Sequence, residues 1–177
     1  VFLHPFTLFR NIMKTAVILS ARQDKDTQIP YPLKPYHKDM CLMDRTIEAL
    51  TALDYTDIYL IVGGQAQMYH KYASDHVHLV LNPDYKFTSS MGSLACVAPY
   101  IKEDFLLVEG DTFYEYKVLK ALSETKNENC FAITEESGSG DEAFVETKNG
   151  YITKVSKDRH QICNFEGELL GIVKISK

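Results

Sequence analysis

In the sequence Lys14-Thr-Ala-Val-Ile-Leu-Ser-Ala-Arg-Gln-Asp-Lys-Asp-Thr-Gln-Ile-Pro-Tyr-Pro-Leu-Lys34, an apolar run leads directly into a polar, charged loop. Residues 16–19 are continuously apolar, which is typical of a strand buried on both faces of a parallel sheet. The loop carries cationic side chains at Arg22, Lys25 and Lys34. Ligands of open α/β sheets bind beyond the carboxyl ends of the strands. The sequence therefore predicts a phosphate-binding loop after this strand, with a solvated surface loop as the alternative.

A second apolar run, residues 105–108, ends in Glu109-Gly-Asp111. This order places a carboxylate at the expected carboxyl edge of the sheet. Mg²⁺ is typically held by one or two carboxylates together with substrate phosphates. Asp111 is therefore the candidate metal ligand, with Glu109 and Glu115 as further carboxylates, and an ordinary turn aspartate is the alternative. We expect Arg22 and Asp111 to line one cleft in which a metal-bound nucleoside triphosphate reacts.

The rest of the chain alternates strand-like and helix-like segments. Such alternation with short connections predicts a parallel sheet with right-handed crossovers and helices on its faces. The expected fold class is therefore α/β, with a Rossmann-like, mostly parallel sheet and flanking helices. The expected strands cover residues 16–19, 58–62, 77–81, 105–108 and 131–134, and the expected helices cover residues 44–53, 65–73, 92–98 and 116–123.

A small β hairpin insertion is expected before the last strand. Residues 143–147 and 151–155 flank Lys148-Asn-Gly150, and Asn-Gly between two β-rich runs is the strongest short hairpin signal. An acidic patch, Glu166-Gly-Glu168, then precedes the expected last strand at residues 169–175. The insertion either recognises a second substrate or is a plain surface hairpin.

Composition narrows the class of protein. The 177 residues suffice for one domain with a full core. A net charge of −5 with scattered basic residues argues against nucleic acid as the main partner, and no apolar run reaches the length of a membrane span. The widely spaced cysteines predict reduced core thiols in a cytoplasmic protein. We interpret residues 1–13 as an upstream extension or an expression remnant, and residues 14–177 as the folded domain.

The segment from Asn82 to Ser93 is a long polar loop that enters a helix. Its hydroxyl and amide groups suit recognition of the edge of a nucleotide base, because unpaired polar groups discriminate strongly between ligands. The alternative is that Ser89 or Ser90 caps the helix.

These motifs, in their order along the chain, resemble those of a known family. They are Ala16-Val-Ile-Leu-Ser-Ala-Arg22, Cys41-Leu-Met-Asp-Arg-Thr-Ile-Glu-Ala-Leu50, Ile58-Tyr-Leu-Ile-Val-Gly-Gly64, Ser89-Ser-Met-Gly-Ser-Leu94 and Glu109-Gly-Asp111. The family comprises the nucleotidyltransferases that activate sugars and small phosphoesters, which have a nucleotide-diphospho-sugar transferase-like fold. The serine-rich loop is most similar to that of the phosphocholine and 2-aminoethylphosphonate cytidylyltransferases.

The resemblance implies transfer of CMP from CTP to a small phosphate or phosphonate of an amino alcohol, with Mg²⁺ and with release of pyrophosphate. It also implies a role for each matching residue. These roles are catalysis for Lys25, Lys34 and Asp111, nucleotide binding for Ser20, Ala21, Arg22, Ser89, Ser90 and Ser93, acceptor binding for Glu166 and Glu168, and metal binding for Asp111. For Glu166 and Glu168 the alternative is a solvated acidic turn.

Some features depart from the family pattern. The family's glycine-rich loop usually reads Gly-x-Gly-x-Arg, whereas Arg22, Asp24 and Asp26 stand here, and Leu33 separates a proline from Lys34. Related enzymes also carry a further segment after the position of Lys177, which includes a second metal-binding carboxylate. We therefore expect either that the domain is truncated at its C-terminus, as part of a longer and fused protein, or that its metal site is incomplete. The expected protein partner is a fusion partner or a second copy of the chain in a homo-oligomer. The alternative functions are a degenerate nucleotide-binding module without turnover, or a nucleotidyltransferase that uses another nucleotide and a sugar phosphate.

Overall fold

The computed structural model describes residues 13–22 and 28–177. The interpretation of residues 1–12 and the predicted role of Lys25 therefore lie outside the described residues.

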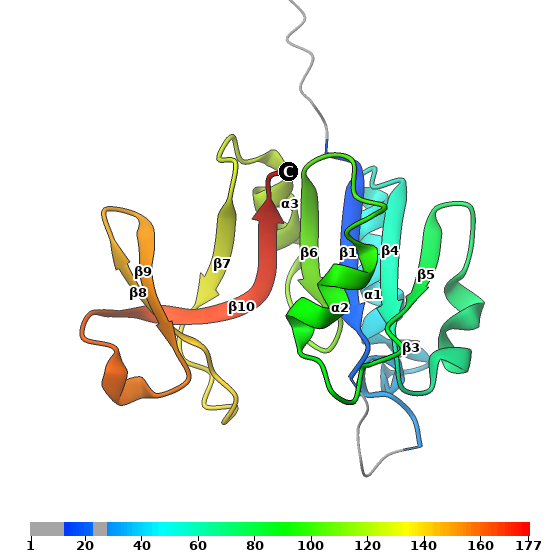
Figure 1. Cartoon of the computed structure of the whole chain (residues 1–177), viewed down its shortest axis with the longest axis horizontal. Helices are drawn as coiled ribbons and strands as arrows, with labels where there is room; N and C mark the ends of the chain where they lie inside the picture. Colours follow the sequence, from blue (N-terminus) through cyan, green and yellow to red (C-terminus); the bar gives the residue numbers. More distant parts are fainter. Residues whose placement is uncertain (1–12, 23–27) are drawn as a thin grey trace, which may run out of the picture.

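The centre of the molecule is a parallel sheet with the strand order β5-β4-β1-β6 (Figure 1). Its strands are β1 (Thr15–Ser20), β4 (Asp57–Val62), β5 (Val77–Leu81) and β6 (Phe105–Glu109). Strand β1 pairs in parallel with β4 on one side and with β6 on the other. Val17 and Ile18 are fully buried because helices cover both faces of this strand. The predicted parallel sheet is thus confirmed.

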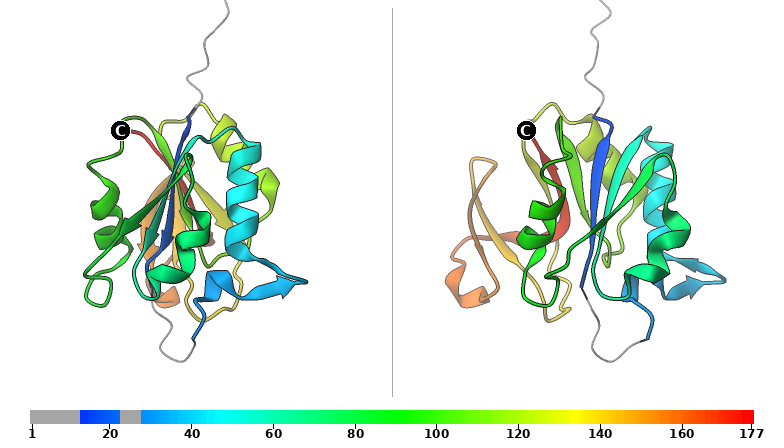
Figure 2. Two further views of the ribbon diagram at one scale, coloured as in Figure 1. Left: turned by 90° about the vertical axis from the view of Figure 1, so that its right-hand side faces the viewer. Right: turned by 45° about the vertical axis from the view of Figure 1, so that its right-hand side comes forward.

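Helices cover the two faces unequally (Figures 1 and 2). On one face lie α1 (Leu42–Ala52) and α3 (Tyr116–Glu124), and Leu50 of α1 packs in the same apolar cluster as Ile18. On the other face lies α2 (Ser90–Val97), whose Val97 packs with Val17. Because successive strand residues point to opposite faces, odd-numbered residues of β1 and β6 face α2 and even-numbered residues face α1.

Strand β10 (Phe165–Ile175) joins the sheet to a smaller β region. Its C-terminal half pairs antiparallel with β6, and its N-terminal half pairs with β8 (Phe144–Lys148). The register shifts around Gly171, whose φ of 76° is a left-handed conformation that favours glycine. Strands β7 (Cys130–Thr134) and β9 (Tyr151–Ser156) complete this region.

The structure of the β region tests the predicted hairpin and the predicted start of the last strand. The hairpin is confirmed, with Asn149 and Gly150 at φ values of 53° and 80° in its turn. The expected start of the last strand at residue 169 is wrong, because β10 begins at Phe165 and includes Glu166 and Glu168. The alternative of a solvated acidic turn at Glu166-Gly-Glu168 is also wrong, because these residues lie within β10.

The helical segments also differ in detail from the prediction. Helix α1 begins at Leu42 rather than at Asp44, which instead accepts a hydrogen bond from Cys41 N at 2.9 Å in a capping box. The expected helix at residues 65–73 is the 3₁₀ helix η2 (Ala66–Tyr72). The remaining elements, which the sequence did not predict, are η1 (Tyr31–Leu33), β2 (Pro35–His37), β3 (Met40–Cys41) and η3 (Arg159–Gln161).

All four cysteines are described and are free thiols, but only Cys41 is buried, and Cys163 is exposed. The expectation that every thiol belongs to the core is therefore wrong for Cys163. Among the described residues, no helix has the length and apolar character needed to span a membrane.

Candidate functional site

A cleft of about 1300 Å³ lies on the α2 face of the sheet. It extends from the N-terminal part of α2, across the ends of β1 and β6, to β7, β10 and the loop that precedes β8. Arg22 and Asp111 both line it, as the sequence predicted. The lining also includes Ala21, Tyr85, Ser89, Ser90, Ser93, Glu109, Phe113, Asp141, Glu142, Lys157 and Glu168.

The loop after β1 enters the cleft at Ala21 and Arg22. Its backbone is packed closely, since a Cβ atom on Gly63 would lie 2.4 Å from Ala21 O and 2.6 Å from Tyr85 Cβ. Only glycine therefore fits at residue 63 without moving this wall of the cleft. Ser20 points to the opposite face, where its Oγ is 2.7 Å from Tyr69 Oη. Its side chain is thus engaged away from the cleft.

The end of β6 supplies the carboxylates. Glu109 and Asp111 line the cleft, and Gly110 N donates a hydrogen bond to Leu19 O at 2.9 Å, which fixes the end of β6 against β1. Burial raises the pKa of Glu109, and the negative charges of Asp111 and Asp141 raise it further. A cation bound beside Glu109 and Asp111 would therefore be stabilised electrostatically, because it would offset the repulsion between these carboxylates.

Two cations and a further carboxylate also meet in the cleft. Lys157, directly after β9, donates a hydrogen bond to Asp141, and Arg22 Nη1 lies 4.0 Å from Asp141 Oδ2. The hydrogen bond and charge of Lys157 lower the pKa of Asp141. Sequence reasoning missed Lys157 and Asp141. The available signal was that Lys157 follows a strand end in the predicted hairpin, as Arg22 follows β1.

The serine-rich loop is held by Asn82, which is only 1% exposed. Its Nδ2 donates to Ser93 Oγ at 3.0 Å and to Thr88 Oγ1 at 2.9 Å. The hydroxyl of Ser93 is therefore engaged within the loop. Ser89 is the N-cap residue of α2, but within the described residues its side chain makes no capping hydrogen bond. Ser89 and Ser90 are exposed and line the cleft.

The other predicted site residues separate into two groups. Glu168 lines the cleft, is 8% exposed, and accepts a hydrogen bond from Ser137 N at 3.0 Å. Glu166 is exposed and accepts a hydrogen bond from Thr147 Oγ1 at 3.1 Å, and it does not belong to the described lining. Lys34 is also outside that lining, with its Nζ 5.6 Å from the ring centre of Tyr31.

The donor atoms suit Mg²⁺ only in part. Within residues 13–22 and 28–177, no group of three or more His, Cys, Asp or Glu side chains is arranged to hold a metal ion. Glu109 and Asp111 nevertheless offer carboxylate oxygens that interact electrostatically in one cleft. Mg²⁺ accepts one or two protein carboxylates when phosphates and water complete its octahedron. The residues present thus fit a magnesium ion whose remaining ligands come from a phosphate-bearing molecule and water.

No family model matches the chain. Among curated proteins, a CMP-5'-(3-aminopropyl)phosphonate synthase of Streptomyces rubellomurinus is 25% identical over 119 residues, which is 64% of this chain. The chain covers only 19% of that protein's length.

Several solved structures with the same fold are named as nucleotidyltransferases. The inositol-1-phosphate CTP transferase of T. maritima matches with a TM-score of 0.76 and 20% identity, over 95% of this chain and 72% of that chain. A putative glucose-1-phosphate thymidylyltransferase of Bacillus anthracis gives 0.74 and 13% identity, over 92% and 71%. The CTP:phosphocholine cytidylyltransferase of Streptococcus pneumoniae gives 0.65 and 16%, over 93% and 72%. The predicted nucleotide-diphospho-sugar transferase-like fold is therefore confirmed.

Proposed function

We propose that this chain is a cytidylyltransferase domain that transfers CMP from CTP to a small phosphate- or phosphonate-bearing amino alcohol. The observation that supports this most directly is that Arg22 after β1, Glu109 and Asp111 at the end of β6, and Lys157 after β9 all line one cleft. Cations suited to phosphates thus share this cleft with carboxylates suited to a divalent ion. The likeness to a CMP-aminopropylphosphonate synthase and to two CTP-using transferases favours CTP as the nucleotide.

The proposed reaction is a displacement at phosphorus. An oxygen of the acceptor phosphate or phosphonate forms a bond to the α-phosphorus of CTP, while the bond from that phosphorus to the bridging oxygen breaks and pyrophosphate leaves. Arg22 and Lys157 would neutralise the charge on the phosphates and hold them in line. Mg²⁺, held by Asp111 with Glu109 beside it, would supply further charge neutralisation at the triphosphate.

Recognition of the two substrates would use opposite ends of the cleft. Ser89 and Ser90 offer hydroxyl groups at the α2 end, where the base or ribose would lie. Glu168 and Glu142 make the other end acidic, which suits an ammonium group. A buried carboxylate such as Glu168 prefers an opposite charge because it has lost most of its hydration.

A second candidate function is nucleotide binding without turnover. The observation that favours it is the position of Asp141, whose carboxylate already interacts with Arg22 and Lys157. If no ligand displaces Asp141, these cations are not available to the phosphates of a nucleotide.

Pyrophosphate release separates these functions. The chain would be incubated with CTP, UTP, GTP or ATP, with Mg²⁺, and with phosphocholine, 2-aminoethylphosphonate, 3-aminopropylphosphonate, inositol 1-phosphate or glucose 1-phosphate. We expect turnover with CTP and an amine-bearing acceptor. Nucleotide binding without turnover would instead support the second candidate, and turnover with another nucleotide and glucose 1-phosphate would support a sugar nucleotidyltransferase.

Asp111→Asn tests the role of the carboxylate. We expect the Mg²⁺-dependent rate to fall by a factor on the order of 100 or more, because charge stabilisation at the phosphates is lost, while the thermal unfolding midpoint stays close to that of the wild type. Glu115→Gln is the matched control, since Glu115 is an exposed carboxylate just before α3. An unchanged rate for Asp111→Asn would remove Asp111 from the mechanism.

A further inference from the structure

The loop after β6 crosses the edge of the sheet. Asp111, Thr112 and Phe113 line the cleft on the α2 face, whereas Tyr114 is 6% exposed and packs in the apolar cluster on the α1 face. Asp111 is itself exposed in the cleft. The position of Asp111 therefore depends on what holds the other end of this short loop.

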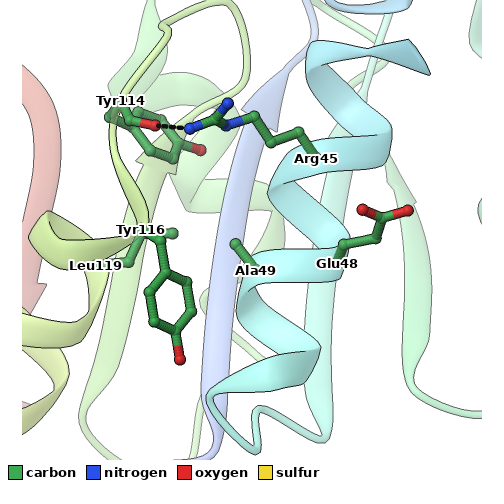
Figure 3. A pocket seen from close by; sticks show the side chains of 6 residues that line it. All are labelled: Arg45, Glu48, Ala49, Tyr114, Tyr116 and Leu119. Atoms are coloured by element: carbon green, nitrogen blue, oxygen red, sulfur yellow. Dashed lines mark hydrogen bonds between the residues drawn. The ribbon is translucent and has the colours of Figure 1, made fainter.

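Arg45 of α1 holds that end by two contacts. Its Nη2 donates a hydrogen bond to Tyr114 O at 3.1 Å, and its guanidinium carbon lies 4.3 Å from the centre of the Phe113 ring (Figure 3 shows the hydrogen bond). A guanidinium group is planar and can donate at its edge while it stacks on an aromatic face. A lysine ammonium at this position could make either contact but could not reproduce the stacked plane.

Further contacts hold Tyr114 and Phe113. Thr46, the next residue of α1, has its Oγ1 2.9 Å from Tyr114 Oη and also donates to Leu42 O. Tyr36 of the β2–β3 hairpin packs edge-on against Phe113, with ring centres 5.9 Å apart. Arg45 thus connects a capped helix to a loop whose other residues reach the cleft.

We propose that Arg45 is a positioning residue that acts through Phe113 and Tyr114 to hold Asp111 in place. The proposal rests on the proposed function, because it is the transferase reaction that requires Asp111 to be fixed. Arg45 lines a small neighbouring pocket of about 280 Å³ with Glu48 and Tyr116, on α1 and at the start of α3, and it is not part of the described lining of the cleft. Its effect on the reaction is therefore indirect.

The first test compares Arg45→Ala and Arg45→Lys with Glu48→Ala, which lines the same small pocket on the same helix. For Arg45→Ala we expect kcat to fall on the order of 10- to 100-fold, as for displacement of a reacting group by about 1 Å. The KM for CTP should change by less than about threefold, because Arg22, Lys157 and the serine loop are intact. Arg45→Lys should recover only part of kcat, and Glu48→Ala should resemble the wild type.

The second test does not depend on activity. Amide hydrogen exchange over residues 110–116 should become faster in Arg45→Ala while exchange in β1 and β4 is unchanged. Millimolar guanidinium, which can enter the space left by the side chain, should slow this exchange again and restore part of kcat in Arg45→Ala only. Arg45→Lys should exchange at an intermediate rate.

The outcomes distinguish this inference from the proposed function. Wild-type chain without turnover on any nucleotide would overturn the proposed function, and the exchange experiment would still decide whether Arg45 holds the loop. Wild-type turnover with an unchanged kcat in Arg45→Ala would overturn the inference alone. Unchanged exchange over residues 110–116 would overturn it as well, even if kcat fell.

Discussion

Gly171 and Glu109 both line the cleft, and the Glu109 side chain packs against Gly171. Gly171 lies at the bend of β10, and a Cβ atom there would lie 2.9 Å from Glu109 Oε2 and 3.1 Å from Glu109 Cβ. The carboxylate could swing away from such a group, but the Cβ atom of Glu109 could not move without β6. The absence of a side chain at residue 171 thus allows a carboxylate to lie over the strand.

Gly171→Ala should therefore be more destabilising than Gly150→Ala. Both glycines have positive φ values, 76° and 80°, but nothing lies within 4 Å of a Cβ atom on Gly150. We expect Gly150→Ala to cost about 1 kcal/mol from the left-handed backbone alone, and Gly171→Ala to cost on the order of 1 kcal/mol more from crowding. Urea unfolding of the two variants measures this difference, and equal losses would contradict the crowding argument.

Asp44 links the start of α1 to η2. Its Oδ1 accepts from Tyr72 Oη at 2.7 Å, its Oδ2 accepts from Cys41 N at 2.9 Å, and Lys71 Nζ lies 3.7 Å away. Burial opposes ionisation of this carboxyl, but the hydrogen bonds from Tyr72 and Cys41 outweigh it, so the pKa of Asp44 is lowered. The charged form is thus favoured in the folded protein.

Asp44→Asn should lower the free energy of unfolding by about 1–3 kcal/mol at neutral pH. Because the folded pKa lies below the ordinary value of 3.8, the contribution of Asp44 is complete above that value and is lost as the pH falls through the lowered pKa. Unfolding of wild type and variant across this range should therefore converge at acid pH. Asp39→Asn, in the exposed hairpin turn, is the control, and a pH-independent difference would exclude this linkage.

The loop between β7 and β8 places the carboxylates of Asp141 and Glu142 in the cleft. Ser137 N is held by Glu168, and the next residues turn at Gly138 and Gly140 before Asp141 reaches Lys157 and Arg22. The side chains of Asp141 and Arg22 are 67% and 75% exposed, so their ion pair is weak. Phosphates that bind these cations would displace the Asp141 carboxylate.

Asp141→Asn should therefore tighten the binding of CTP. We expect a decrease in Kd of roughly two- to fivefold at low salt, in line with the small energy of exposed ion pairs, and a smaller decrease at high salt because of screening. Calorimetry measures both values. Glu142→Gln is the control, because Glu142 also lines the cleft but accepts its hydrogen bond from Gly140 N. Equal effects of both variants would indicate general charge repulsion rather than competition by Asp141.

The whole molecule combines two regions into one cleft. The parallel sheet contributes Arg22 and Asp111, and the β region joined to it by β10 contributes Lys157 and Glu168. Figure 2 shows the β8–β9 hairpin on the far side of β10 from the parallel strands. Each substrate would therefore be recognised mainly by one region, and the reaction would occur where the two regions meet.

This arrangement predicts that Glu168 and Glu166 differ in their effects on the acceptor. Glu168→Gln should raise the KM for the amine-bearing acceptor by about tenfold, because a buried charge-assisted contact would be lost, with little change in the KM for CTP. Glu166→Gln should leave both constants unchanged, since Glu166 is exposed and bonded to Thr147. Initial-rate kinetics test both variants, and an effect of Glu166→Gln alone would contradict the proposed acceptor end.

The sequence by itself determined the parallel core of this protein and the two loops that meet at its edge. Continuous apolar runs such as residues 16–19 and 105–108 can be satisfied only when both faces are covered, and residues that follow such strands must share one edge of the sheet. The sequence alone therefore predicts that Arg22 and Asp111 lie in one cleft, and both residues line it.

Only the tertiary structure decided which further side chains reach that edge. Ser20 turns away because strand alternation and its contact with Tyr69 place it on the α1 face. Lys157 and Asp141 reach the cleft because the bent strand β10 pairs antiparallel with both β6 and β8. This long-range pairing produces no local periodicity in the sequence. The sequence thus predicted the side of the cleft that Arg22 and Asp111 form. The side with Lys157 and Asp141 depends on the path of the bent strand β10.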